Sequence, residues 1–198
     1  MEKKRYFIKG ALETGDTVTT DDRHIQVMRH SIGDEVVLFN GDGNDVQALK
    51  CSELGVKAFV PFVSRNTVVT MNTNRAERLR RIAEESGKQC KRSALMHVHH
   101  VMTFSEALMA AEGCTLKLFA YEKETARGLF SAMQAAEGAK DIALLVGCEG
   151  GFTAEEAAKA VRAGFVAVSL GKTILKADTA AVAGAAAVLC CAKAWEPS

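Results

Sequence analysis

Apolar runs and glycine-bearing turns alternate in the second half of the chain, and this pattern predicts buried strands that lead into loops. Residues 142–146 form a continuous apolar run between Asp141 and Gly147, which is typical of a strand covered on both faces in a parallel sheet. Residues 165–170 form a second such run, which ends at Gly171. Two strands of this kind predict an α/β fold.

A helix is expected between these two strands. Thr153 and Glu156 have the spacing of a capping box, so the helix should begin near Ala154 and end at Gly164. A further helix is expected after the Gly171 loop. Because ligands in parallel sheets bind outside the carboxyl ends of the strands, both glycine loops are expected at a ligand-binding edge.

The composition of the two loops distinguishes them from ordinary turns. A single glycine after a strand is common turn chemistry in α/β proteins. Here, however, Glu149 lies inside the glycine loop of residues 147–151, and Ile174 and Leu175 interrupt the second loop with apolar bulk. We therefore predict that the two loops close together around one pocket.

The first part of the chain has a different pattern. Residues 1–45 contain short strand-like runs separated by turns, which predict a small β domain. From residue 46 helices and strands alternate, so we expect a second domain over residues 46–198. The expected elements are a helix ending at Gly55, a strand over 56–63, helices from Arg75 and over 103–112, and a strand over 116–121.

Composition and charge limit the class of protein. With 198 residues, 48% of them hydrophobic, the chain can bury a real core, and a charged start with no long apolar run predicts a soluble, cytoplasmic protein without a membrane partner. The six cysteines show no C-x-x-C spacing and are expected to be reduced and mostly buried. No metal site is expected either, since in a strand His97 and His99 would share one face while His100 points to the other, and no carboxylate lies close in sequence.

A local excess of positive charge stands out against a net charge of +1. Residues 65–92 carry eight Lys and Arg residues against three acids. In a helix over 75–90 the inward stripe would be Leu79, Ile82, Ala83, Ser86 and Cys90, with Arg78, Arg81, Glu85 and Lys88 on another side. A solvated helix face or a surface that contacts RNA phosphates would both explain this pattern.

Several segments resemble one family. LLVGCEGGFTAEE (144–156) and LGKTILKADTAAVAG (170–184) resemble the cofactor-loop segments of the RsmE-like ribosomal RNA uridine-N3 methyltransferases, within the SPOUT superfamily. Shorter matches occur in the same order along the chain, at residues 5–6, 24–29, 33–41, 50–56 and 89–92.

This resemblance implies a fold and a function. It implies an α/β fold with a SPOUT-type trefoil-knotted parallel sheet flanked by helices, preceded by a small PUA-like β-barrel that grips RNA and that is incomplete here. It also implies a homodimer that uses S-adenosylmethionine to methylate N3 of a uridine in the ribosomal RNA of the small ribosomal subunit. The same loops would equally suit a ribose 2′-O enzyme or a transfer RNA substrate, and a non-catalytic knotted RNA-binding or assembly protein is the alternative from another class.

Site residues follow from the resemblance, with the chemistry of their side chains in support. The implied cofactor-binding residues are Phe119, Tyr121, Val146, Gly147, Glu149, Gly150, Gly151, Leu170, Gly171, Ile174, Leu175 and Thr179. The candidate catalytic residues are Arg92, Glu149 and Lys176, and the candidate RNA-binding residues are Arg5, His24, Arg29, Arg78, Arg81, Lys88 and Arg92. Glu149 could act as a base, whereas Arg92 or Lys176 could stabilise an anionic uridine.

The chain departs from the family pattern at several positions. Cys148 replaces a proline, and Lys176 and Asp178 stand where the family has arginine and glutamate. Lysine cannot reproduce the planar bidentate fork of arginine. Compared with the family, several barrel strands are absent between residues 43 and 50. We therefore predict that the join near Asp45–Val46 is not a native covalent link and that residues have been left out there.

Overall fold

The computed structural model describes residues 35–40, 45–68, 73–92 and 94–195. The predicted turns and strands of residues 1–34 lie outside the described residues. The same holds for three of the candidate RNA-binding residues, Arg5, His24 and Arg29.

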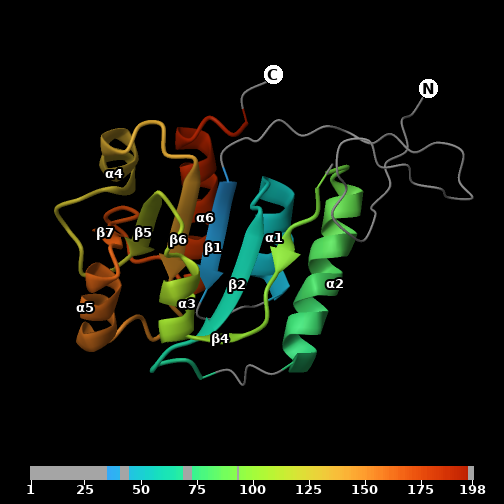
Figure 1. Cartoon of the computed structure of the whole chain (residues 1–198), viewed down its shortest axis with the longest axis horizontal. Coiled ribbons are helices and arrows are strands. Elements are labelled where there is room, and N and C mark those ends of the chain that lie inside the picture. The colour runs from blue at the N-terminus through green and yellow to red at the C-terminus, as the bar shows by residue number, and fades with distance from the viewer. Residues whose placement is uncertain (1–34, 41–44, 69–72, 93, 196–198) are drawn as a thin grey trace, which may run out of the picture.

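The described strands form one parallel sheet (Figure 1). Its order is β3-β2-β1-β6-β5-β7, and the short strand β4 pairs with the end of β2. The strands are β1 (Glu35–Asn40), β2 (Ala58–Val63), β3 (His97–Val98), β4 (Met102–Thr103), β5 (Leu116–Ala120), β6 (Asp141–Val146) and β7 (Val166–Val168). The helices are α1 (Asp45–Leu54), α2 (Thr73–Gln89), α3 (Phe104–Ala110), α4 (Leu129–Ala135), α5 (Ala154–Arg162) and α6 (Ala177–Cys191).

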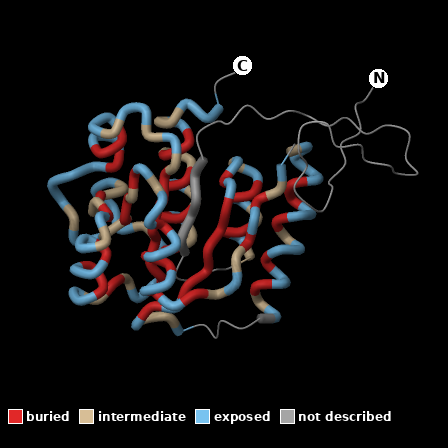
Figure 2. The backbone as a smooth tube through the Cα atoms, viewed as in Figure 1, coloured by how far each residue is buried: buried red, intermediate tan, exposed pale blue. Residues whose placement is uncertain are grey.

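The helices cover both faces of the sheet, and each face has its own apolar core. Successive residues of a strand point to opposite faces, so Leu144 belongs to the core on the side of α1, α2, α4 and α6, whereas Leu145 belongs to the core on the side of α3 and α5. Figure 2 shows buried strands lying between helices whose outer sides are exposed. The continuous apolar run of β6 is therefore explained by burial on both sides, as the sequence predicts.

The capping box predicted at Thr153 is confirmed. The Thr153 hydroxyl accepts a hydrogen bond from the Glu156 amide, and the Glu156 carboxylate accepts one from the Thr153 amide at 2.9 Å. The helix ends before Gly164, whose φ of +86° favours glycine. The other helices and strands expected after residue 46 are also present, although β7 is shorter than its apolar run, and α4 is an additional helix.

The expected domain boundary at residue 45 is wrong, because residues 35–40 belong to the sheet of the domain that follows. Strand β1 lies in the sheet between β2 and β6, parallel to both, and so belongs to the same unit as the residues that follow. The expected discontinuity at Asp45–Val46 stays a prediction; both residues lie in the first turn of α1. The apolar sequence of β1 suits a central parallel strand better than the edge of a small barrel.

The expectation that the cysteines are mostly buried is also wrong for the described fold. Only Cys51 and Cys148 are buried, while Cys90 and Cys190 are exposed. Cys90 lies just beyond the end of α2, so it leaves the inward stripe to which Leu79 and Ala83 belong. Among the described residues, no helix is long and apolar enough to cross a membrane.

Candidate cofactor and active site

Three loops meet at the carboxyl edge of the sheet. The loops of residues 147–152 and 169–176 follow β6 and β7, and the loop of residues 121–128 follows β5, which lies between those two strands. Together they line one cleft of about 1010 Å³. The prediction that the two glycine loops share a pocket is confirmed.

Most residues assigned to the cofactor from sequence line this cleft. They are Tyr121, Val146, Gly147, Glu149, Gly150, Gly151, Leu170, Gly171, Ile174 and Leu175. Phe119 does not line the cleft, because it is fully buried and stacks under Tyr121 with ring centroids 4.9 Å apart. Thr179 is exposed on α6 and lies outside the lining.

The glycines allow close packing around the cleft. A Cβ on Gly147 would lie 3.0 Å from the Phe152 ring, which is tighter than ordinary contact. Gly151 and Gly171 have φ values of +62° and +137°, a region that other residues rarely adopt. Glycine is therefore needed here for backbone shape as well as for space.

Backbone hydrogen bonds join the β5 loop to the β7 loop. The Ser169 amide donates to the Arg127 carbonyl at 2.8 Å, and the Ser169 carbonyl accepts from the Leu129 amide at 3.0 Å. The Glu124 carboxylate accepts bonds from the Arg127 and Ala126 amides, which lower the pKa of this exposed group. Two loops that are distant in sequence therefore form one wall.

The cleft carries charged groups of both signs. Its carboxylates are Glu122, Glu124, Glu149 and Asp178, and its ammonium groups are Lys172 and Lys176. The Asp178 carboxylate accepts a hydrogen bond of 3.0 Å from the side chain of Gln47 on α1. Sequence reasoning did not identify Glu122 or Glu124, because the β5 loop contains no glycine-rich motif; its position beside the other two loops is decided by strand order.

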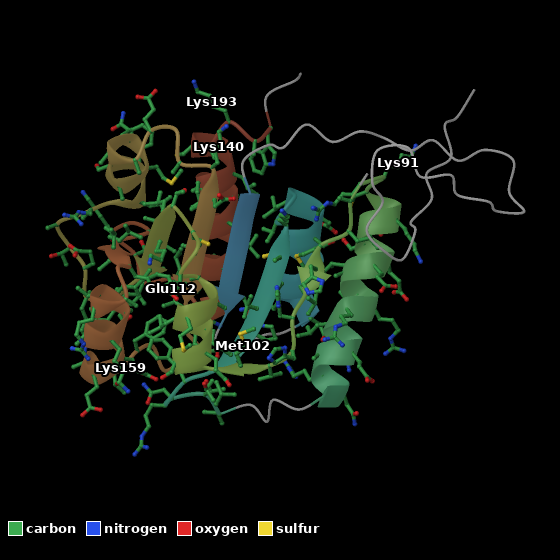
Figure 3. All side chains as sticks on the ribbon, viewed as in Figure 1. Lys91, Met102, Glu112, Lys140, Lys159 and Lys193 are labelled. Carbon is green, nitrogen blue, oxygen red and sulfur yellow. The ribbon has the colours of Figure 1, made fainter. Side chains whose placement is uncertain are left out.

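Arg92 does not reach this cleft within the chain. Its guanidinium donates to the carbonyls of Ser52, Gly55 and Val56 at 2.7–3.3 Å, where α1 ends and β2 is about to begin. That is the amino edge of the sheet: in Figure 3 its neighbour Lys91 lies at the opposite end of the molecule from Met102 and Lys159. Burial lowers the pKa of the Arg92 guanidinium, and the observed contacts are those of a helix cap.

The candidate RNA-binding residues of α2 are also outside the cleft. Arg78, Arg81 and Lys88 are exposed, and Arg78 forms an ion pair with Asp45. Helix α2 packs beside β3 at one end of the sheet, and Figure 1 shows it on the opposite side of the molecule from β7. Nearby, the rings of His97 and His99 contact edge to face at 4.4 Å, and no cluster of three metal-ligating side chains occurs within the described residues.

A second cleft of about 780 Å³ adjoins the same edge of the sheet. It lies between the end of β2 and the starts of α3 and α5, and its lining includes Arg65, Ser105 and Lys159. Glu155 and Glu156 also line it. The edge therefore offers two clefts, one lined by the glycine loops and one between the end of β2 and the starts of α3 and α5.

Comparison with known proteins identifies the family. The sequence pattern of the RNA methyltransferase domain matches residues 36–189, which include the described strands, except for the first residue of β1, and nearly all of α6. The chain belongs to the RNA methyltransferase domain family. The matched region begins within β1, in agreement with the place of that strand in the sheet.

The curated relatives include two named ribosomal RNA small subunit methyltransferase E. The one from Synechocystis sp. is 34% identical over 146 residues, covering 73% of this chain and 48% of the relative. The one from Bacillus subtilis is 32% identical over 139 residues, covering 66% of this chain and 54% of the relative. The chain thus spans about half the length of these relatives.

Solved structures agree with the fold. A ribosomal RNA small subunit methyltransferase E from Neisseria gonorrhoeae, bound to S-adenosyl methionine, is similar with a TM-score of 0.67 and 33% identity, covering 79% of this chain and 65% of that one. A probable rRNA-methyltransferase from Porphyromonas gingivalis has a TM-score of 0.74 at 22% identity, covering 86% and 73% of the two chains.

Proposed function

We propose that this chain carries the catalytic domain of an S-adenosylmethionine-dependent methyltransferase that acts on N3 of a uridine in 16S ribosomal RNA. The observation that carries this proposal is the single cleft formed by three loops at the carboxyl edge of the sheet, in a chain of the RNA methyltransferase family. The acceptor nucleotide follows from relatives that this chain covers by about half, so it needs its own test.

The lining residues fit S-adenosylmethionine. Leu170, Ile174 and Leu175 offer aliphatic surface for an adenine ring, and the glycine loop offers main-chain groups with little steric hindrance. The carboxylates of Glu122 and Asp178 suit a ligand that carries a sulfonium and an ammonium group. The cofactor supplies an electrophilic methyl group when it is bound.

The chain's own residues must position the acceptor and manage its proton. Uridine N3 becomes a good nucleophile only after it loses its proton, so a base or a nearby cation is needed. Glu149 is exposed at the cleft and can accept a proton there. Lys176, at the N-cap of α6, can stabilise negative charge on the base, and it is better placed for this role than Arg92.

Further features of the family belong to this proposal. We propose that the sheet is trefoil-knotted, that the domain works as a homodimer in the cytoplasm, and that residues 1–34 belong to a PUA-like RNA-binding part. The pairing of Ser169 with residues 127–129, after which the chain turns back to pack α6 on β1 and β6, supports the knot. The second cleft, where Arg65 and Lys159 line the surface together with Glu155 and Glu156, offers a place for the RNA strand at the same edge of the sheet.

Calorimetric titration with S-adenosylmethionine tests the first step of the proposal. We expect saturable binding by the wild-type chain and its loss in a Gly171→Val variant, because valine is strained at a φ of +137°. The matched control is Gly113→Val, since Gly113 lies away from the cleft and a Cβ there meets nothing within 4 Å. No binding by the wild-type chain would favour a non-catalytic RNA-binding role.

Mass spectrometry of ribosomal RNA tests the acceptor. A strain that lacks the gene should lose one methylated uridine in small-subunit ribosomal RNA, and the wild-type gene should restore it. If the methylated uridine is unchanged in the strain that lacks the gene, while a ribose or a transfer RNA loses a methyl group, then the protein uses the same cofactor site to methylate another substrate.

A further inference from the structure

A tight turn after β2 contacts the glycine loop after β6 from outside the cofactor cleft. This turn comprises residues 64–67, and it is closed by the Thr67 amide, which donates to the Ser64 carbonyl at 3.2 Å. The Ser64 amide also donates to the Thr67 hydroxyl at 2.9 Å. These hydrogen bonds hold the backbone of the turn in which Asn66 lies.

Asn66 spans the loop with two hydrogen bonds. Its Nδ2 donates to the Gly150 carbonyl at 2.8 Å and to the Gly151 carbonyl at 3.2 Å. A Cβ on Gly150 would lie only 2.7 Å from the Asn66 Cβ, so the two backbones approach closely at this point. Both glycines line the cofactor cleft, whereas Asn66 does not.

The two residues before Asn66 also hold the turn, one to α5 and one to the glycine loop. The Arg65 amide donates to Glu156 Oε1 at 2.8 Å, and the other oxygen of that carboxylate caps α5. Ser64 Oγ lies 3.7 Å from Cys148 Sγ. On the cleft side, the Glu122 carboxylate packs against Gly151, where a Cβ would lie 3.0 Å from its Oε1. The glycine loop is thus held between Asn66 and Glu122.

We propose that Asn66 is a positioning residue for the cofactor: by holding the Gly150 and Gly151 carbonyls on its own side, it sets the orientation of the peptide groups that face the cleft. This inference rests on the proposed function. Two glycines in sequence leave this loop many backbone conformations, and one of them has a φ of +62°. Fixing that conformation before binding removes an ordering cost that the cofactor would otherwise have to offset.

An isosteric change tests the donor role directly. Asn66→Asp keeps the shape of the side chain but replaces its NH₂ donor with an oxygen that faces two carbonyl oxygens. At about pH 8 we expect the variant to bind S-adenosylmethionine about 10-fold more weakly than the wild type, with an unchanged KM for RNA. Towards about pH 5 the difference in affinity between the variant and the wild type should become smaller, because a protonated carboxyl group can again donate one hydrogen bond.

Controls separate this role from general stability and from the proposed function. Val68→Ala removes atoms from a neighbouring, 94% exposed side chain and should leave both affinity and Tm unchanged. The inference is wrong if Asn66→Asp binds the cofactor as tightly as the wild type does. It is also wrong if Asn66→Asp and Asn66→Ser lower Tm and affinity together without any pH rescue. Absence of binding by the wild type would instead overturn the proposed function.

Discussion

Gln47 and Asp178 connect the first and last helices of the described fold through one hydrogen bond: the fully buried amide of Gln47 donates to the Asp178 carboxylate at 3.0 Å. Asp178 lines the cofactor cleft, whereas Gln47 does not. A residue of α1 therefore controls the position of a carboxylate that the ligand would meet.

Replacing Gln47 by leucine should destabilise the protein. The change removes a hydrogen bond to a charged group in a partly buried place, so we expect the free energy of unfolding to fall by about 1–3 kcal/mol. Urea unfolding monitored by circular dichroism measures this. The Gln47→Glu variant should be less stable at neutral pH than at acid pH, because at neutral pH two carboxylates face each other. Equal stability of Gln47→Leu and the wild type would show that the hydrogen bond contributes nothing.

Glu156 should contribute far more to the stability of the fold than its neighbour Glu155 does. The Glu156 carboxylate caps α5 and also accepts the Arg65 amide, so Glu156→Ala should lower the free energy of unfolding by about 2 kcal/mol. Glu155→Ala is the matched control, since Glu155 is exposed in the same helical turn. Similar unfolding midpoints for the two variants would contradict the capping and bridging role.

Arg92 should behave as a structural residue. Arg92→Ala removes guanidinium bonds to the carbonyls of Ser52, Gly55 and Val56, and we expect a loss of about 2 kcal/mol in stability with unchanged affinity for S-adenosylmethionine. Lysine should restore stability only in part, because it lacks the planar fork. Arg81→Ala serves as an exposed control. A stable Arg92→Ala variant that had lost only turnover would restore the catalytic assignment made from sequence.

Ile174 should contribute to binding and little to folding. Its side chain is 80% exposed yet lies in the cofactor cleft, so an aspartate there should weaken S-adenosylmethionine binding at least about 10-fold with little change in Tm. Met109→Asp is the control, since Met109 is 70% exposed and lies outside the cleft. Calorimetric titration of both variants, with Tm measured alongside, distinguishes a cleft residue from an ordinary exposed side chain.

Cys51 should make stability fall in alkaline solution. Burial raises the pKa of its thiol from 9.0 to about 12, so the folded state keeps a proton that the unfolded state releases. Its contribution is fully present below about pH 9 and is lost as pH rises towards about 12. Urea unfolding across this range should show a shallower decline for Cys51→Ala than for the wild type, and parallel curves would contradict the assignment.

Local patterns were sufficient to predict much of this fold. The apolar run of β6, the Thr153–Glu156 capping box and the stop at Gly164 each depend on a few adjacent residues, and each is confirmed. The shared cleft was predictable as well, because the carboxyl ends of parallel strands meet at one edge. The place of β1 was not, since an apolar run of only four residues, 36–39, does not show which strands lie beside it.

The sequence by itself determined most of the helices and strands, the glycines that shape the loops and the family to which the loops belong. Only the tertiary structure decided which distant residues meet. Strand order brings Glu122 beside Gly151, chain folding brings Asn66 against Gly150, and the end of α1 engages Arg92 at the opposite edge of the sheet. Such contacts depend on non-local packing, and no spacing along the chain encodes them.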